Sequence, residues 1–380
     1  MTKKPPFSAI GLDRWREYDD VLTDSLWLFE SRDRGGGHQL DYHGNYIPQI
    51  ATQIYTRYTR QDGYWTGSGK FSLRLYFRNR YGPGALDYPL FAESEVEQFH
   101  SIVLRGGHND RTNPFIKDEL LRRLHKDMGQ RACMGNFVNL FINGEHKGYF
   151  NPTEHIKDDS CQQWFDSEEP WDVMTMNGIR DGNQQSWSEM LDLVRSNNLA
   201  IDAHYQAALG KLDAVSFIDY LIIRLWPNDW DWPQNNWAAA AERSATGRWK
   251  FFVWDAEGTF RTSELYVDRF GELNSQNNPN AQIYRALKAS PRFRQLFADR
   301  LYKHFYNGVA MSTENINARF SELQEHLRGI IPNMDRYIIN GWTPTRHEVL
   351  FDACVREGMY TFDGPVFAVN GAYTLWTLDY

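Results

Sequence analysis

Two short stretches in the middle of this 380-residue chain decide how its fold is interpreted. The first reads NDWDWPQNN from Asn228 to Asn236, and the second reads RWKFFVWDAEGTF from Arg248 to Phe260. The aromatic and β-branched residues of the second stretch predict a strand that ends at Trp254 and Asp255. The first stretch follows a predicted helix over residues 214–225, so we expect it to form a loop between this helix and the strand.

Polar residues in these stretches have the types and spacing of a phosphoryl-transfer site. Asp231 and Asn236 lie five positions apart in the loop, and Asp255 stands at the end of the strand. Transfer from a nucleotide needs one carboxylate to orient the acceptor hydroxyl, and an amide and a second carboxylate to hold Mg²⁺. We therefore predict that Asp231 and Asn236 are catalytic and that Asn236 and Asp255 bind the metal. Asp229 has the same spacing to Gln234, a poorer metal partner, and turn chemistry alone also explains a loop aspartate such as Asp231.

A lysine at the start of a predicted strand adds a phosphate-binding candidate. Lys70 opens the alternating segment KFSLRLYFR, and its ammonium group can reach phosphate oxygens as a point charge. Glu119, on the predicted helix of the same region, is the natural carboxylate to hold this lysine. The glycines before Lys70 do not form a P-loop, because Tyr64 occupies the first glycine position and Phe71 follows the lysine. A solvated lysine and an exposed helix charge stay open as alternatives.

The order of strand and helix signals predicts an α+β fold. Residues 70–150 indicate two strands, a helix and a hairpin whose Asn143-Gly144 turn is a strong local signal. After about Asp158 the periodicity is mostly helical, interrupted by one strand at 248–254. We expect a β-rich part followed by a helical part. The expected elements are strands at 70–78 and 99–104, a helix at 114–128, a hairpin at 136–150, and helices at 187–196, 201–209, 214–225, 281–288, 291–305 and 313–328.

Composition excludes several classes of protein. The net charge of -8, from 41 basic and 49 acidic residues, argues against binding to nucleic acid through phosphate electrostatics. Three widely spaced cysteines offer neither a disulfide framework nor a zinc site. No apolar run approaches the eighteen residues of a membrane span. The first nine residues lack the apolar core of a signal peptide, so we expect a cytoplasmic protein as the chain stands.

With these residues in view, the chain resembles the CotH kinase family, the spore-coat protein H relatives that are atypical members of the protein-kinase-like fold. The resemblance covers about residues 66–373 and implies a two-lobed fold. It predicts a β-rich N-lobe over 66–156 and a mostly helical C-lobe over 157–380. The blocks that carry it, in the family's order, are KFSLRLYFRNRYGPGALDYPLF, FHSIVLRGGHNDRTNPFIKDELL, LFINGEHKGYFNPTEHI, NDWDWPQNNW, RWKFFVWDAEGTF and RHEVLFDACVREGMY.

The resemblance implies a role for each candidate residue. Lys70 would contact ATP phosphates, and Asp231 and Asn236 would belong to the catalytic loop. Asp255, in WDAEGTF, would be the metal-binding aspartate. Glu154, in NPTEHI, matches a recurrent family glutamate near the hinge and joins the cofactor-binding candidates. The implied cofactors are ATP and Mg²⁺ or Mn²⁺.

The function that this resemblance implies is an atypical protein kinase. Such an enzyme would transfer the γ-phosphate of ATP to Ser or Thr hydroxyls of a protein substrate, either a coat or a surface protein. Family members are often secreted or associated with the spore coat. The alternative is a catalytically impaired, kinase-like scaffold that binds a protein partner.

The front of the chain departs from the family pattern. Residues 13–65 resemble the N-terminal part of DNA adenine-N6 or cytosine-N4 methyltransferases, so residues 1–65 would be a truncated module fused to the kinase-like part. No Asp/Asn-Pro-Pro-Tyr/Phe/Trp motif is present, and a complete methyltransferase is therefore excluded. A remnant that touches DNA through Arg57 and Arg60 is the weakest hypothesis.

Overall fold

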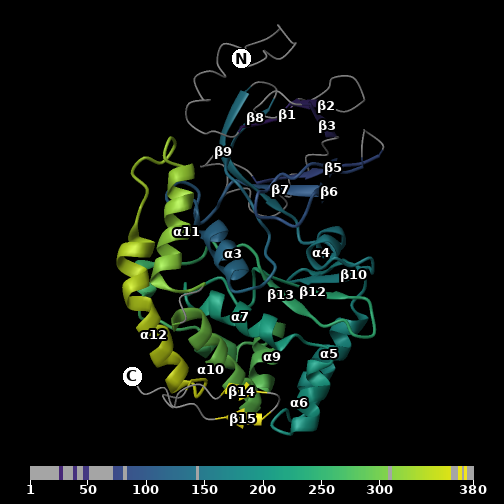
Figure 1. The fold of residues 1–380 in the computed structure, drawn as a ribbon, viewed down its shortest axis with the longest axis vertical. Coiled ribbons are helices and arrows are strands. Elements are labelled where there is room, and N and C mark those ends of the chain that lie inside the picture. The colour runs from purple at the N-terminus through teal and green to yellow at the C-terminus, as the bar shows by residue number, and fades with distance from the viewer. Residues whose placement is uncertain are drawn as a thin grey trace. The chain divides into compact units, whose positions relative to one another are not determined.

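The structure is a computed structural model of the chain, and Figure 1 shows its helices and strands. It describes residues 25–28, 37–40, 46–50, 72–79, 84–142, 145–306, 310–360, 367–369 and 372–374. Of these, residues 25–28, 37–40, 46–50, 142, 145, 367–369 and 372–374 are described by their backbone alone. The chain divides into two compact units: Met1–Glu119 with Cys133–Ser167 and Ser321–Asp335, and Leu120–Ala132 with Glu168–Phe320 and Arg336–Tyr380.

The first unit contains a five-stranded sheet in the order β1-β8-β9-β7-β4. Strand β1 is parallel to β8, and the other neighbouring pairs are antiparallel. Two short pairs, β2 with β3 and β5 with β6, form separate ladders. The elements are β1 (Ser25–Leu28), β2 (Gly37–Leu40), β3 (Tyr46–Ile50), β4 (Leu73–Tyr76), β5 (Leu86–Asp87), β6 (Gln98–Phe99), β7 (Ser101–Arg105), β8 (Val138–Ile142), β9 (Glu145–Glu154) and α4 (Asp158–Phe165).

The strand predictions for this unit are confirmed. β4 alternates buried and half-buried residues, as its sequence alternation predicts, and every residue of β7 is buried between β4 and β9. The predicted hairpin is formed by β8 and β9, although its turn residues lie outside the described part. Lys70 also lies outside the described residues.

Helix α3 (Lys117–Asp127) begins later than predicted. We expected it to start at Pro114, but Phe115 has a left-handed backbone with a φ of 62°, which a helix cannot include. The carboxylate of Asp110 accepts hydrogen bonds from the backbone N–H groups of Phe115 and Lys117, at 2.9 and 2.8 Å. Asp110 therefore fixes the turn that precedes the helix and satisfies amides that would otherwise lack partners.

The second unit contains a four-stranded antiparallel sheet that the sequence analysis largely missed. Its strand order is β11-β10-β12-β13, from β10 (Trp171–Thr175), β11 (Gly178–Asp181), β12 (Trp237–Glu242) and β13 (Lys250–Val253). Only β13 was predicted. Strand β12 reads WAAAAE, and alanine intrinsically favours a helix, but here its residues are almost all buried between β10 and β13. The prediction of one isolated strand in the second half was therefore wrong.

The helices of the second unit lie close to their predicted positions. α7 is mostly apolar and buried at every position except Val215, so it forms the centre of this unit's core. Three helices were not predicted: α8 and α12 in this unit, and α4 in the first. The remaining elements are α5 (Gln185–Ser196), α6 (Asp202–Leu209), α7 (Ala214–Leu225), a 3₁₀ turn (Thr262–Glu264), α8 (Phe270–Ser275), α9 (Pro279–Lys288), α10 (Pro291–Tyr306), α11 (Thr313–His326), a π-helical turn (Ile338–Trp342), α12 (Thr343–Arg356), β14 (Phe367–Val369) and β15 (Ala372–Thr374).

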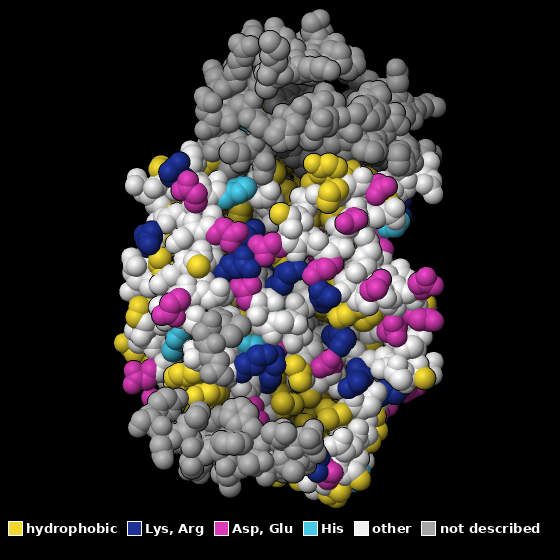
Figure 2. Space-filling view, viewed as in Figure 1, with side chains coloured by type: hydrophobic (Ala, Val, Ile, Leu, Met, Phe, Trp, Pro, Cys, Tyr) yellow, Lys and Arg dark blue, Asp and Glu magenta, His cyan; other side chains and the backbone are white. Residues whose placement is uncertain are grey.

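Two surface properties agree with the composition. Basic and acidic side chains are interspersed over the face in Figure 2, as the scattered charges of the sequence predict. In the part of the chain that the structure describes, no helix combines the length and the apolar character that crossing a membrane requires. The expected mixture of helices and strands is also confirmed.

Candidate active site

A buried arginine joins the two stretches with which the sequence analysis began. Arg224, one residue before the end of α7, is fully buried. Its Nη1 lies 2.5 Å from Oδ2 of Asp229, and its Nη2 donates to the backbone oxygens of Asn236 and of Trp254, the latter at 2.6 Å. One guanidinium group therefore fixes both the loop before β12 and the chain just before Asp255.

Strand pairing brings the two predicted metal ligands to one end of the sheet. β12 and β13 are antiparallel, and Trp237 stands opposite Val253. Continuing this register by one position places Asn236 opposite Trp254, directly before Asp255. The backbone oxygens of Asn236 and Trp254 both accept a hydrogen bond from Nη2 of Arg224, which agrees with this register. Asn236 therefore lies close to Asp255 at this end of the sheet.

Asp231 and Asn236, the predicted catalytic pair, are in direct contact. Oδ2 of Asp231 accepts a hydrogen bond from the side-chain amide of Asn236 at 2.9 Å, and Oδ1 accepts one from Asn235 at 2.8 Å. The backbone N–H of Asp231 donates to Asp229 at 3.2 Å. Two amide side chains therefore hold the carboxylate of Asp231 in a fixed orientation. The half-buried position of Asp231 leaves it access to solvent.

Asp229 has a role that the spacing argument did not assign. It is fully buried, and its two carboxylate oxygens bind Arg224 and the backbone N–H of Asp231. Burial raises the pKa of Asp229 to about 6, while the adjacent Arg224 opposes this rise. Asp229 is therefore the internal counterion of Arg224, not a metal ligand.

Left-handed backbone is concentrated in these loops. Six described non-glycine residues have positive φ values, and four of them are Asn228, Asn236, Asp255 and Phe260, with φ between 53° and 57°. Asn and Asp tolerate this conformation better than other residues, but a phenylalanine rarely adopts it. Each such residue costs on the order of 1 kcal/mol or more, and this strain commonly accumulates at functional sites.

Backbone contacts close the loop against the segment that follows Asp255. The N–H of Trp230 donates to the oxygen of Gly258, and the N–H of Phe260 donates to the oxygen of Pro227, both at 2.9 Å. A Cβ atom at position 258 would lie 3.0 Å from Nε1 of Trp230 and 3.2 Å from Oδ1 of Asp229. Only a glycine allows this close approach without displacing the indole or the carboxylate.

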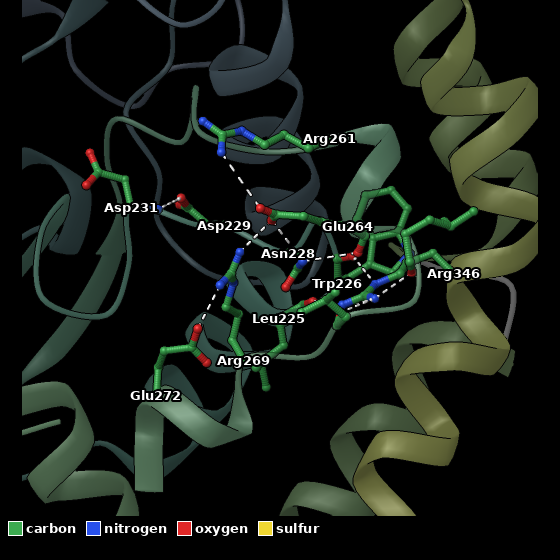
Figure 3. Close-up of polar contacts among 12 residues, drawn as sticks. Leu225, Trp226, Asn228, Asp229, Asp231, Arg261, Glu264, Arg269, Glu272 and Arg346 are labelled. Atoms are coloured by element: carbon green, nitrogen blue, oxygen red, sulfur yellow. Dashed lines mark hydrogen bonds and ion pairs between the residues drawn. The ribbon is translucent and has the colours of Figure 1, made fainter. Parts of the chain in front are cut away.

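A polar network continues from the loop into residues 261–272, as Figure 3 shows. The side-chain amide of Asn228 donates to the backbone oxygen and to Oε2 of Glu264, at 3.1 and 3.2 Å. Arg269 binds Glu264 at 2.5 Å and Glu272 at 2.7 Å. The segment after Asp255 is therefore held to the loop by side chains as well as by backbone.

A second buried arginine holds the other side of this network. Arg346, on α12, donates to the backbone oxygens of Leu225 at 2.9 Å and Trp226 at 2.8 Å. It also donates to the oxygens of Leu265 at 2.8 Å and Val267 at 2.6 Å. The guanidinium group thus joins the end of α7 to the segment after Asp255.

Sequence reasoning missed both buried arginines. Each had a detectable signal: Arg224 interrupts the apolar run YLIIRL, and Arg346 opens the block RHEVLFDACVREGMY. An arginine that a helix buries must be paired, so its presence on an apolar face indicates a polar partner nearby.

The remaining cofactor candidates lie in the first unit. Glu119 is buried, and its Oε2 accepts a hydrogen bond from Asn151 at 3.2 Å. Glu154 is fully buried, and its two oxygens accept hydrogen bonds from the hydroxyl of Ser94 and, at 2.9 Å, from the indole of Trp164. Burial raises the pKa of Glu154 to about 8. Cofactor binding by either glutamate stays a prediction.

Family comparison adds the class of protein. The model of the CotH kinase protein family matches residues 59–343. The chain belongs to this family. Its membership supports a kinase-like function, and the matched span includes Lys70, Glu119, Glu154, Asp231, Asn236 and Asp255.

Other comparisons add little to the family assignment. Among solved structures the chain is similar to the Helicobacter pylori proinflammatory kinase CtkA, with a TM-score of 0.30 and 7% sequence identity. That similarity covers 72% of this chain and 94% of the other. No curated protein sequence matches the chain. The family match begins at residue 59, so the methyltransferase resemblance of residues 13–65, which lie mostly outside the described part, stays a prediction.

Proposed function

We propose that this chain is a phosphotransferase that depends on ATP and Mg²⁺ or Mn²⁺, and that it phosphorylates Ser or Thr hydroxyls of a protein. The two-lobed, kinase-like arrangement of the family is part of this proposal. The observation that supports it most directly is the convergence of Asp231, Asn236 and the chain before Asp255 around Arg224. One loop and the end of the following strand would supply the three polar groups that phosphoryl transfer requires.

The donor set fits a hard divalent cation. The amide nitrogen of Asn236 donates to Asp231, which leaves the side-chain oxygen of Asn236 as a ligand. One carboxylate, from Asp255, and one amide oxygen, from Asn236, are a set that suits Mg²⁺, which proteins commonly hold through one or two carboxylates plus phosphate oxygens of the substrate. Bound metal and ATP would supply the phosphoryl group and neutralise its charge.

Each residue of the chain then has a defined task. Asp231 accepts a hydrogen bond from the acceptor hydroxyl and takes its proton, while the amides of Asn235 and Asn236 hold the carboxylate in place. Asn236 and Asp255 supply oxygen ligands from the end of the β12–β13 pair. In the proposal, Lys70 contacts the phosphates, and Glu119 and Glu154 contribute to the cofactor site.

Transfer of labelled γ-phosphate from ATP tests the proposal, with dephosphorylated casein and a basic protein as generic acceptors. Asp231→Asn and Asp255→Asn should each reduce transfer at least a hundredfold, because general-base and metal contributions are commonly this large. Asp202→Asn is the matched control, since Asp202 is an exposed acid on α6 that pairs with Arg292. Full transfer by both site variants would contradict the proposal.

Thermal stability measures nucleotide binding independently of turnover. A ligand that binds the folded state raises the melting temperature, so ATP with Mg²⁺ should stabilise the wild type and not Asp255→Ala. Absence of stabilisation at millimolar ATP, together with absence of phosphate transfer, would favour the kinase-like scaffold that binds a protein partner. A coat or surface protein as acceptor stays part of the proposal.

A further inference from the structure

A tryptophan precedes each of the two aspartates Asp231 and Asp255, and an arginine guanidinium group lies over the ring of each tryptophan. The guanidinium carbon of Arg261 lies 4.0 Å from the ring centre of Trp230, the residue before Asp231. The guanidinium carbon of Arg180 lies 5.9 Å from the ring centre of Trp254, the residue before Asp255. The first contact is much closer, and it places a positive charge beside the aspartate that would orient the acceptor.

Arg261 differs from the buried arginines of this site in what its donors bind. Within the described part of the chain, no atom accepts a hydrogen bond from its guanidinium group. Its ion pair with Glu264 is long, at 3.7 Å, and its side chain is 48% exposed. The other oxygen of Glu264 already binds Arg269 and Asn228. Trp230 therefore fixes a cation whose donors still face solvent.

We propose that Arg261 is a specificity-determining residue that binds an acidic side chain of the acceptor polypeptide. This inference rests on the proposed function, because it places the acidic group next to the hydroxyl that Asp231 orients. A stacked guanidinium is planar, and its edge presents paired N–H donors that match a carboxylate. Stacking on Trp230 also removes the rotational freedom that an exposed arginine would lose on binding.

The position of Arg261 favours the acceptor over the nucleotide. Arg261 extends from the segment after Asp255 toward the side of the network where Asp231 lies (Figure 3). The metal candidate Asn236 also contacts Asp231, but the ring that holds Arg261 belongs to Trp230, the residue directly before Asp231. Arg261 therefore accompanies the residue that faces the acceptor, and contact with the transferred phosphate is an outcome that the test separates.

The test uses three Ser-containing peptides that differ at the positions flanking the serine, which carry Glu, Ala or Lys. The wild type should phosphorylate the Glu peptide with a kcat/KM roughly tenfold above that of the Ala peptide, the effect of one charge-assisted hydrogen bond. Arg261→Gln should bring this ratio close to one, and Arg261→Glu should favour the Lys peptide. Arg292→Gln is the control, because Arg292 is an equally exposed arginine of α10.

Each result has a distinct meaning. An unchanged Glu-to-Ala ratio in Arg261→Gln would overturn the inference, and so would an equal loss of kcat for all three peptides, which would indicate contact with the transferred phosphate. Equilibrium binding of the same peptides with a fluorescent label provides a readout without turnover. Charge-dependent binding that Arg261→Glu reverses, in a protein with no transfer activity, would retain the inference and refute the proposed function. Binding and turnover that ignore peptide charge would refute the inference alone.

Discussion

Asp229 and Glu154 are both fully buried carboxyl groups, but at neutral pH their surroundings leave one ionised and the other neutral. Asp229 binds Arg224, and its pKa of about 6 leaves it ionised at pH 7. Glu154 binds the neutral groups of Ser94 and Trp164, and its pKa of about 8 leaves it protonated. Burial raises both values, so the presence of a counter-charge decides the difference.

This difference corresponds to what each group does in the fold. The Arg224–Asp229 pair is a charged contact that holds the two loops of the candidate active site. The Glu154 contacts act as a neutral hydrogen-bonded part of the first unit's core. A buried ion pair adds little net stability over an apolar replacement. Removing one partner is strongly destabilising, however, because the other charge is then buried without a counterion. The two regions should therefore respond differently to substitution and to pH.

The largest expected effect comes from breaking the Arg224–Asp229 pair. Arg224→Met should lower the free energy of unfolding by about 3 to 5 kcal/mol, because it leaves the Asp229 carboxylate buried without a counterion. It also removes the donor to Asn236 and Trp254, so phosphate transfer should fall further than stability alone explains. Urea unfolding at pH 7 measures the first effect.

A double-mutant cycle separates the charge effect from lost packing. Asp229→Asn in the Arg224→Met background should recover most of the lost stability, because no charge is then left buried. If Arg224→Met and the double variant are equally unstable, the stranded charge is not the cause. Arg292→Met, at an exposed position of α10, is the control for loss of an arginine side chain.

Glu154 should make stability fall as the pH rises. Its pKa is higher in the folded protein, at about 8, than the ordinary 4.5, so the folded state holds a proton that the unfolded state releases. Stability is therefore lost between pH 4.5 and pH 8. Glu154→Gln lacks this proton, so its stability difference between pH 5 and pH 8 should be smaller by on the order of 3 kcal/mol. Melting curves at both pH values measure it, and parallel losses in the two proteins would refute the neutral state of Glu154.

The elements with strong local signals could be predicted from the sequence. Alternation located β4, the Asn-Gly turn located the β8–β9 hairpin, and apolar content located α7. The contact between Asp231 and Asn236 was also predictable, because both belong to one loop of fixed spacing. The same turn signal at Asn177-Gly178 marks the β10–β11 hairpin, which we overlooked.

The missing parts depend on contacts between distant segments. The alanines of β12 form a strand because β10 and β13 pair with them on both sides, which no local propensity reveals. Arg224 and Arg346 bind backbone oxygens, which every residue has, so the identities of their partners leave no pattern in the sequence. A single sequence can therefore indicate the functional groups of this site without the groups that position them.

A third buried titratable group, His125, should change the pH dependence of stability by an intermediate amount. Both ring nitrogens of His125, on α3, are buried and have no hydrogen-bond partner among the described residues. Burial lowers the pKa of His125 to about 3, while Asp219 opposes this and Arg224, His304 and Arg300 add to it. Between pH 6.5 and pH 3, His125 therefore binds a proton in the unfolded state but not in the folded state. The free energy of unfolding falls as the pH falls below 6.5.

Replacement of this histidine should protect the protein against acid. His125→Leu should lose about 2 kcal/mol less stability than the wild type between pH 7 and pH 5, because 1.5 pH units below the ordinary pKa correspond to that energy. Urea unfolding at the two pH values measures the difference. His204→Leu is the control, since His204 is a half-buried histidine on the short helix α6 whose Nδ1 contacts the backbone oxygen of Asn198. Equal pH dependence in the wild type and His125→Leu would show that His125 takes up a proton in the folded state.

The smallest effect is expected where a charged pair is partly exposed. Asp213 caps the start of α7 by accepting the N–H of Ser216 at 3.0 Å, and it pairs with Lys250 on β13 at 2.5 Å. Burial raises the pKa of Asp213. The hydrogen bonds from Lys250 and from the backbone N–H of Ser216 lower it by more, so the pKa is lower than the ordinary value.

The contributions of the α7 cap and of the Asp213–Lys250 ion pair to stability can be separated by substituting Asp213 and Lys250 in turn. Asp213→Ala should cost about 1 kcal/mol of unfolding free energy through loss of the cap, and Lys250→Met should cost only a few tenths of that, because solvent screens the pair. Unfolding at low and high salt distinguishes the two contributions, since only the ion pair weakens with salt. A salt-independent loss of 3 kcal/mol or more in Lys250→Met would mean that this exposed pair behaves like the buried pair of Arg224 and Asp229, and would remove burial as the cause of the contrast.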